Sequence, residues 1–229
     1  MRQNGVRKGD IRGNRGGSVF AGLRGREVAL SSIMNAFDQT WAKRKRFAAG
    51  NVGTGMLVML IGLPASGKST LTEAFESRGW LRLNKDSIRK ELYGDEAILG
   101  DPKEVNRVFY ERLEEACRQS RRIVVDNLNL NQFYRKGPIA TARERGYVDI
   151  TNIVLDVPVD ECVRRNALRA RQVPEAVIRQ HAMTLKAGFP SQAEGRLLVL
   201  ANAQSQDGAS INRNRFVVKR SRAPLIVRA

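Results

Sequence analysis

An apolar strand followed directly by a glycine-rich loop limits the possible folds of this sequence more than any other feature. Residues 56–61 read MLVMLI, a run typical of a strand that is buried on both faces. Residues 62–69 read GLPASGKS, and a helical pattern follows directly. This is the spacing of a phosphate-binding loop, in its required place between a strand and a helix. The competing interpretation is a glycine-rich turn in which Lys68 and Ser69 occur by chance.

The loop residues predict how a triphosphate would be held. Backbone amides from Ala65 to Ser69 would surround phosphate oxygens at the N-terminus of the following helix. Lys68 would reach the β and γ phosphates, and the Ser69 hydroxyl would ligate Mg²⁺. The predicted nucleotide-binding residues are Gly62, Ala65, Ser66, Gly67, Lys68, Ser69 and Thr70.

Strand and helix patterns alternate through the middle of the chain. The predicted strands are 56–61, 80–83, 122–126 and 150–155, and the predicted helices are 69–77, 86–92, 102–118, 132–145, 159–169 and 175–186. This alternation predicts an α/β fold with a doubly wound parallel sheet and helices on both faces. Ligands bind such a sheet beyond the carboxyl ends of its strands.

Two acidic residues follow predicted strands at that edge. Asp86 could accept a proton from an attacking hydroxyl group, or it could simply cap the next helix. Arg89 lies one turn further on and could grip an anionic acceptor, or it could be a solvated surface charge. Asp126 ends the strand 122–126, where it could support Mg²⁺ through water or serve as a buried structural carboxylate.

An arginine cluster forms the candidate lid. Residues 164–171 read RRNALRAR, and Val173 and Pro174 follow. Cations held so close together favour a bound anion, and phosphoryl transfer needs positive charge on the phosphate in transit. A solvated helix face is the alternative interpretation.

The net charge of +17 is unevenly distributed over the 229 residues. Residues 56–190 carry +4, whereas residues 1–55 carry +8 and residues 191–229 carry +5. Basic ends favour a polyanionic partner, nucleic acid before membrane. We expect residues 1–55 to form a largely disordered arm with one helix at 31–47 and a linker at 50–55. Residues 56–190 are the predicted domain, and residues 191–229 are a basic tail whose apolar runs at 197–200 and 224–227 could add edge strands.

Cysteine and hydropathy patterns exclude several protein classes. Cys117 and Cys162 are far apart in the sequence and His181 is the only histidine, so neither a disulfide framework nor a zinc site is expected. No apolar run approaches the roughly 18 residues needed to cross a bilayer, and no signal peptide is recognisable. We expect a soluble, intracellular, cytoplasmic protein with no membrane partner.

Four spaced segments resemble the kinase module of the phage-type 5′-hydroxyl polynucleotide kinases, P-loop kinases related to zeta-toxin-like proteins. The segments are GLPASGKST at 62–70, NKDSIR at 84–89, DNLNLN at 126–131, and DVP at 156–158 leading into Arg165, Asn166, Arg169 and Val173-Pro174. The resemblance covers about 135 of the 229 residues. No phosphatase signature follows in residues 191–229, so 3′-end repair is not expected.

The resemblance implies a P-loop kinase with an arginine-rich lid. Such an enzyme would phosphorylate the 5′-hydroxyl end of DNA or RNA, and it could act in a phage-infected cell. ATP and Mg²⁺ would be held by Lys68 and Ser69, with Arg165 also on the nucleotide. Asp86 would act as general base, Arg89 would bind the acceptor phosphate, and Arg169 would contact the transferring phosphate. Residues 126–131 fit in two registers, so either Asp126 or Asn127 takes the family's acidic position at the metal.

Two other functions fit the same motifs. The chain could be a P-loop kinase of a small acceptor such as a nucleotide sugar or a metabolite, because acceptor pockets vary more than phosphate pockets. It could also be an inactive P-loop protein that binds nucleic acid. The presence of Lys68, Ser69, Asp86 and Arg169 together argues against the inactive form.

Overall fold

The computed structural model of this protein describes residues 20, 23, 25–47, 55–204 and 211–222. The arm before residue 20, the predicted linker up to residue 54 and the predicted strand at 224–227 lie outside these residues. No helix of the described residues is both long enough and apolar enough to cross a membrane.

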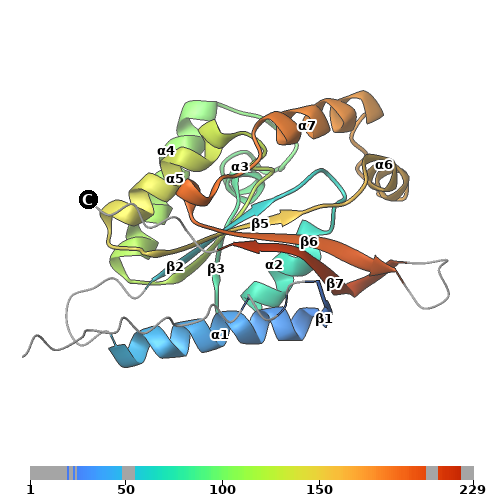
Figure 1. The fold of residues 1–229 in the computed structure, drawn as a ribbon. Coiled ribbons are helices and arrows are strands. Elements are labelled where there is room, and N and C mark those ends of the chain that lie inside the picture. The colour runs from blue at the N-terminus through green and yellow to red at the C-terminus, as the bar shows by residue number, and fades with distance from the viewer. Residues whose placement is uncertain (1–19, 21–22, 24, 48–54, 205–210, 223–229) are drawn as a thin grey trace, which may run out of the picture.

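One sheet organises the described part of the chain (Figure 1). Its strands, in spatial order, are β1 (Glu27–Ala29), β7 (Ile211–Arg222), β6 (Arg196–Gln204), β5 (Asp149–Leu155), β2 (Met56–Ile61), β4 (Arg122–Asp126) and β3 (Leu81–Leu83). The strands from β3 to β6 run parallel, whereas β7 is antiparallel to β6 and β1 is antiparallel to β7. Met59 of β2 pairs with Val125 and Asn152, so the strand that leads into the phosphate loop lies inside the sheet.

Helices cover both faces of the sheet, which confirms the predicted α/β fold (Figure 1). The helices are α1 (Leu30–Phe47), α2 (Lys68–Glu76), α3 (Lys85–Tyr93), α4 (Pro102–Arg118), α5 (Gln132–Glu144), α6 (Val159–Ala167) and α7 (Glu175–Ala187). One core cluster joins α1 and α2 to the sheet, and a second joins α3, α4 and α5 to its other face. β2 is buried along its whole length because both faces are covered, and this is the reason for its continuous apolar sequence.

The start of α4 shows how local sequence fixes an element boundary. The Asp101 side chain accepts a hydrogen bond from the Lys103 amide, and Pro102 occupies the first turn. The apolar face of α4 is buried against the sheet through Val105, Phe109, Leu113 and Ala116. α4 thus packs against β4 through this core, and β4 ends with Asp126 at the carboxyl edge of the sheet.

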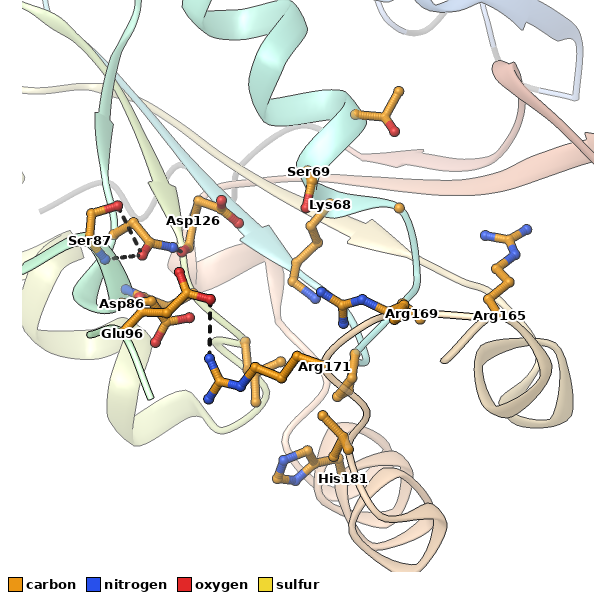
Figure 2. A pocket seen from close by; sticks show the side chains of 18 of the residues that line it. Lys68, Ser69, Asp86, Ser87, Glu96, Asp126, Arg165, Arg169, Arg171 and His181 are labelled. Atoms are coloured by element: carbon orange, nitrogen blue, oxygen red, sulfur yellow. Dashed lines mark hydrogen bonds and ion pairs between the residues drawn. The ribbon is translucent and has the colours of Figure 1, made fainter. Parts of the chain in front are cut away.

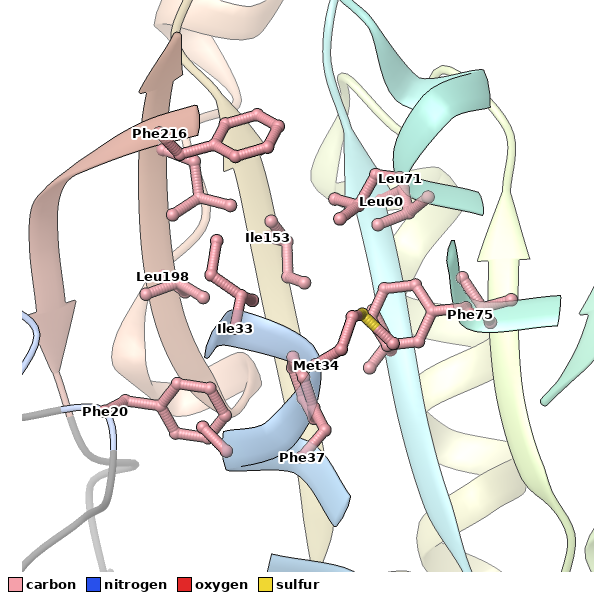
Figure 3. Packing of buried hydrophobic residues seen from close by; sticks show 14 of the residues in the cluster. Phe20, Ile33, Met34, Phe37, Leu60, Leu71, Phe75, Ile153, Leu198 and Phe216 are labelled. Carbon is pink, nitrogen blue, oxygen red and sulfur yellow. The ribbon is translucent and has the colours of Figure 1, made fainter. Parts of the chain in front are cut away.

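The N-terminal extension packs on the core instead of forming a separate arm. The helix predicted at 31–47 is α1, and its residues Ile33 and Phe37 are fully buried in the core cluster that also contains Phe75 of α2 (Figure 3). Phe37 makes edge-on ring contacts with Phe20 at 4.8 Å, with Phe75 at 5.2 Å and with Trp80 at 5.6 Å between centroids. Disorder was expected up to residue 30, yet residues 27–29 form β1. The sequence has few apolar residues before residue 30, which predicted that burial could not offset the entropy cost of ordering the chain. Burial of several aromatic rings contributed by distant segments offsets this cost.

The C-terminal segment also belongs to the sheet. β6 is parallel to β5, its residues Leu197–Leu200 are buried, and β7 covers its outer edge. A strand at 197–200 was expected only at the edge of the sheet, but β6 lies between two other strands. The described parts of the arm and the tail thus share one sheet and one core with residues 56–190, and the domain extends beyond the predicted limits at both ends.

Candidate active site

The loop between β2 and α2 presents backbone amides at the carboxyl edge of the sheet. Gly67 precedes α2 with φ of +100°, and Ala65 has φ of +60°, a left-handed conformation that is costly for a residue with a side chain. α2 has no side-chain cap and no acidic residue in its first turn. Its first amides and the positive end of its dipole are therefore available to a phosphate group.

Lys68 is folded back over this loop. Its ammonium group donates hydrogen bonds of 2.7 Å to the carbonyl oxygens of Gly62 and Leu63. Burial lowers the pKa of Lys68 to about 8; Asp126 acts to raise this pKa, and Arg169 acts to lower it further. The charge is held in position although no carboxylate pairs with it among the described residues, which is the arrangement expected of a lysine that awaits an anionic ligand.

Ser66 and Ser69 have different places in the loop. The Ser66 hydroxyl is buried and has no hydrogen-bond partner among the described residues. Ser69 is exposed, and it lines the cleft in front of the loop. A hydroxyl at the start of α2, facing the cleft, is the kind of oxygen donor that Mg²⁺ uses together with phosphate oxygens.

Asp126 lies at the end of β4, nearly buried, and still lines the cleft. Arg82 donates to its carboxylate at 2.6 Å, and the Asn84 side chain donates to its backbone carbonyl. Both interpretations of Asp126 from the sequence thus describe part of its setting, because it is buried and ion-paired and also faces the cleft. Asn127, the alternative in the second register, accepts a hydrogen bond from the backbone amide of Lys85 and lines the same cleft.

Asp86 is exposed in the first turn of α3. The cap of this helix is Asn84, whose side chain accepts a hydrogen bond from the Ser87 amide at 2.9 Å. The capping interpretation of Asp86 is therefore wrong, and its carboxylate stays available at the cleft. Arg89 pairs with Asp86 but does not line the cleft.

The arginine cluster lies opposite these carboxylates. α6 ends at Ala167, two residues earlier than predicted, so Arg169 and Arg171 are in the loop that follows. Asn166 closes this loop, since its side chain donates to the Val173 carbonyl at 2.8 Å and accepts from the Val173 amide at 3.0 Å. No described residue forms an ion pair with Arg169, which points into the cleft as an uncompensated cation (Figure 2).

Arg165 is more firmly held than Arg169. It donates to Glu161 at 2.6 Å and to the Asn202 side chain at 3.3 Å. Asn202 belongs to β6, so the predicted tail contributes a residue to the lining of the cleft. This contact holds α6, which carries Arg165, against β6 of the sheet.

The cleft between the loop, α3 and the lid has a volume of about 650 Å³ (Figure 2). It brings together most of the predicted site residues: Ala65, Gly67, Lys68, Ser69, Thr70, Asp86, Asp126, Arg165 and Arg169. Gly62, Ser66 and Arg89 do not line the cleft, because Gly62 and Ser66 are buried within the loop and Arg89 pairs with Asp86. Lining residues that the sequence analysis did not select include Arg82, Asn84, Glu96, Val173, His181 and Asn202.

Some of these additional residues carried a recognisable signal. Arg82 and Asn84 flank the end of a predicted strand, where polar side chains reach the ligand edge. His181 lies on α7, and burial together with the charge of Lys68 lowers its pKa. Glu96 and Asn202 carried no such signal, because they reach the cleft through the tertiary fold alone.

Comparison with known proteins places the chain in a family. Residues 57–190 match the family model AAA_33, described as an AAA domain. The chain belongs to this family. Its fold is that of a P-loop kinase, with the phosphate-binding loop sequence between β2 and α2.

Three similar proteins differ in their sequence identity to this chain and in how much of each chain is covered. The L-seryl-tRNA(Sec) kinase of Methanococcus maripaludis is 30% identical over 136 residues, which are 54% of this chain and 50% of that protein. A chain in the structure of the Pnkp1/Rnl/Hen1 RNA repair complex is 23% identical with a TM-score of 0.54, covering 61% of this chain and 46% of that one. A gluconokinase from Sinorhizobium meliloti is 22% identical with a TM-score of 0.45, covering 68% of this chain and 86% of that one. The chain thus spans about half the length of the curated relative that it matches.

Proposed function

We propose that this protein transfers the γ phosphate of ATP to the 5′-hydroxyl end of a polynucleotide. The observation that carries the proposal is the position of Asp86: its carboxylate is exposed at the cleft, whereas Lys68 and Arg169 line the same cleft as cations. A base on one side of a site and positive charge on the other are the two elements that phosphoryl transfer to a hydroxyl group needs.

The loop residues fit ATP and Mg²⁺. The first turn of α2 has no side-chain cap that would compete with a phosphate for its amides, and Lys68 is held by two carbonyl groups at the loop. Ser69 would hold Mg²⁺ directly, and Asp126 would hold it through water. Bound Mg²⁺ would neutralise charge on the phosphates. The described residues contain no group of three or more His, Cys, Asp or Glu side chains that could hold a metal ion.

The acceptor hydroxyl would enter beside Asp86. Asp86 accepts the hydroxyl proton as the oxygen forms a bond to the γ phosphorus, and the bond from this phosphorus to the β,γ-bridging oxygen breaks to release ADP. Arg169 and Lys68 stabilise the charge on the phosphate in transit. Arg89 forms an ion pair with Asp86, and in this proposal it would bind the next phosphate of an acceptor strand.

The positive charge of the cleft and the names of two similar proteins support a nucleic-acid acceptor over a small-molecule acceptor. The cleft has four arginines on its walls, namely Arg82, Arg165, Arg169 and Arg171. One relative is named as a kinase of seryl-tRNA and one solved structure as part of an RNA repair complex. Kinases of small acceptors and an inactive nucleic-acid-binding protein are the alternatives.

The seryl-tRNA kinase match favours a second candidate, transfer to a hydroxyl group carried on a tRNA. The chemistry at Asp86 and Arg169 would be the same, because the acceptor is again a hydroxyl group on a polyanion. The two candidates differ in which hydroxyl enters the cleft, so the choice of acceptor separates them.

The test is transfer of labelled γ phosphate from ATP to a panel of acceptors by the full chain. The panel contains 5′-hydroxyl DNA and RNA oligonucleotides, the same strands with 5′-phosphate ends, seryl-tRNA, gluconate and shikimate. We expect label on the 5′-hydroxyl strands and none on the blocked strands. Label on seryl-tRNA or on a small acceptor alone would reject the polynucleotide proposal in favour of the corresponding alternative.

Variants assign the roles within the site. Asp86→Asn should lower turnover by about 100- to 10,000-fold, with ATP affinity nearly unchanged, because the carboxylate acts on the acceptor. Arg169→Ala should lower turnover strongly with a small change in the KM for ATP. Asp160→Asn, which changes an exposed carboxylate on α6, is the matched control and should keep wild-type turnover. An Asp86→Asn variant with more than a tenth of wild-type turnover would place the base elsewhere.

A further inference from the structure

An exposed aromatic pair follows the cleft-lining residues Asn127 and Leu128 a few positions along the chain, and it has no role in the chemistry above. Phe133 and Tyr134 open α5 with 78% and 62% of their surface exposed. Their rings stand edge to face, with centroids 5.6 Å apart. Single exposed apolar side chains are common on protein surfaces, but two adjacent large rings at the start of a helix form a patch.

The loop before α5 connects this pair to the cleft. Asn127 and Leu128 line the cleft, and Asn131 then caps α5 by accepting a hydrogen bond from the Phe133 amide at 2.9 Å. The chain therefore passes from the cleft wall to the aromatic pair within a few residues. A strand whose end lies in the cleft would meet this pair as it leaves.

A buried arginine fixes the pair in place. Arg135 is fully buried, and it donates to the carbonyl oxygens of Leu130 at 3.0 Å and Gly188 at 2.7 Å and to the Glu194 carboxylate. A β carbon at Gly188 would lie 2.7 Å from the Leu130 carbonyl oxygen, so the end of α7 approaches the start of α5 very closely. This hydrogen-bond network thus holds the first turn of α5 against the end of α7.

The surroundings of the pair suit a polyanion. Phe189 follows Gly188 directly and is 40% exposed, which adds a third ring at this edge. Lys136 and Lys186 are exposed on the two helices that meet here. The first turn of α5 contains no acidic residue, and the nearby Glu194 is neutralised by Arg135.

We propose that Phe133 and Tyr134 form a stacking platform for the bases of the acceptor strand next to the end that enters the cleft. This inference rests on the proposed function, because it deepens the same acceptor site. Aromatic side chains stack on bases without regard to sequence, while neighbouring lysines attract the backbone. The platform would select a single-stranded acceptor several nucleotides long over a mononucleotide.

The test compares acceptors of different length in the full chain. The double variant Phe133→Ala/Tyr134→Ala should raise the KM for a 5′-hydroxyl decanucleotide by about 10-fold or more, because each lost stack weakens binding by that order. Turnover at saturating strand, the KM for ATP and the KM for a nucleoside 3′-monophosphate should stay within twofold. Phe133→Trp/Tyr134→Phe should restore the KM for the decanucleotide, since it keeps both rings.

Two controls separate stacking from a general surface effect. Val148→Ala removes an exposed apolar side chain just before β5, at the amino end of the parallel strands and away from the cleft. This variant should leave every KM and the turnover unchanged. A decanucleotide with abasic sites next to its 5′-terminal nucleotide should bind the wild type as weakly as the alanine variant binds the intact strand. An unchanged KM for the decanucleotide in the alanine variant, or an equal loss with the mononucleotide, would overturn the platform.

Direct binding distinguishes this failure from failure of the proposed function. Fluorescence anisotropy with a labelled 5′-hydroxyl decanucleotide measures strand affinity without phosphoryl transfer. Strand binding that needs both rings, in a protein that phosphorylates no 5′-hydroxyl end, would support the platform and reject the proposed reaction. Phosphorylation of strands with no effect of the rings on affinity would reject the platform alone, and the patch would then be a protein-docking surface.

Discussion

The guanidinium group of Arg171 lies 3.2 Å from the carboxylate of Glu96, so an ion pair joins the lid to the loop after α3 across the mouth of the cleft (Figure 2). Both side chains are about half exposed. Pairs of this kind contribute little to the overall stability of a protein. They can still favour the closed state of a loop, because the open and closed states of a loop often differ by a similarly small free energy.

We expect Glu96→Gln to loosen the lid without unfolding the protein. Amide hydrogen exchange in the peptide 168–173 should accelerate by about two- to fivefold, because an exposed pair contributes roughly 0.2–1 kcal/mol. The thermal midpoint should change little. Glu91→Gln, which breaks the exposed pair with Arg112 away from the lid, is the matched control and should leave exchange in this peptide unchanged. Equal exchange rates in wild type and Glu96→Gln would show that the pair does not hold the lid.

ATP affinity should depend on pH through Lys68. Burial lowers the pKa of Lys68 to about 8 in the protein without ligand, and bound phosphates would raise it again. Affinity should therefore be constant below pH 8 and fall as pH rises above 8, by up to about tenfold per unit, with uptake of a proton on binding. Calorimetry at pH 9 in two buffers of different ionisation enthalpy counts this proton.

Lys68→Arg supplies the control for this pH dependence. The guanidinium group stays charged over the whole range, so the variant should bind ATP with an affinity that does not change between pH 7 and pH 9. A wild-type affinity that is equally flat would show that Lys68 keeps its proton in the free protein.

Phe37→Ala should destabilise the protein by about 3–5 kcal/mol, measured by urea unfolding. The ring is fully buried among Phe20, Phe75 and Trp80. A chain that starts at Met56 lacks α1 altogether and should fail to fold to a stable state. Leu99→Ala, at a side chain that is 73% exposed, should change the free energy of unfolding by less than about 0.5 kcal/mol. A stable, active chain starting at Met56 would contradict the packing of α1.

Arg135→Ala should be equally severe, because it leaves the Glu194 carboxylate buried without its partner. Loss of one partner of a buried pair costs about 3–5 kcal/mol. The double change Arg135→Met/Glu194→Leu should recover part of this loss, since it removes both charges. Urea unfolding of the three proteins measures the difference, and a double variant less stable than Arg135→Ala would contradict this account.

The nucleotide half of the site could be predicted from the sequence because its parts are contiguous. The strand 56–61, the loop with Lys68 and Ser69, and the helix after it follow one another without interruption, and local geometry fixes their order. The alternation of strands and helices likewise determined the fold class. Asp86 and Asp126 were found because parallel strands bring their carboxyl ends to one edge.

The limits of the domain could not be predicted in this way. Local patterns predicted the helix at 31–47 and a strand at 197–200, but the burial of α1 and β6 depends on partners far along the chain, such as Phe75 for Phe37 and β5 for β6. A count of local apolar residues contains no information about such partners, so both ends were predicted to lie outside the domain.

The sequence by itself determined the α/β fold, the phosphate loop and the identity of the charged groups around it. The tertiary structure alone decided that Asp86 and Arg169 line one cleft, and that Glu96 and Asn202 meet the residues of the lid. It also placed Phe133 and Tyr134 beside the end of α7. The physical reason is that hydrogen bonds within one turn follow from neighbouring residues, whereas contacts between distant segments depend on how the sheet and its two helical layers pack.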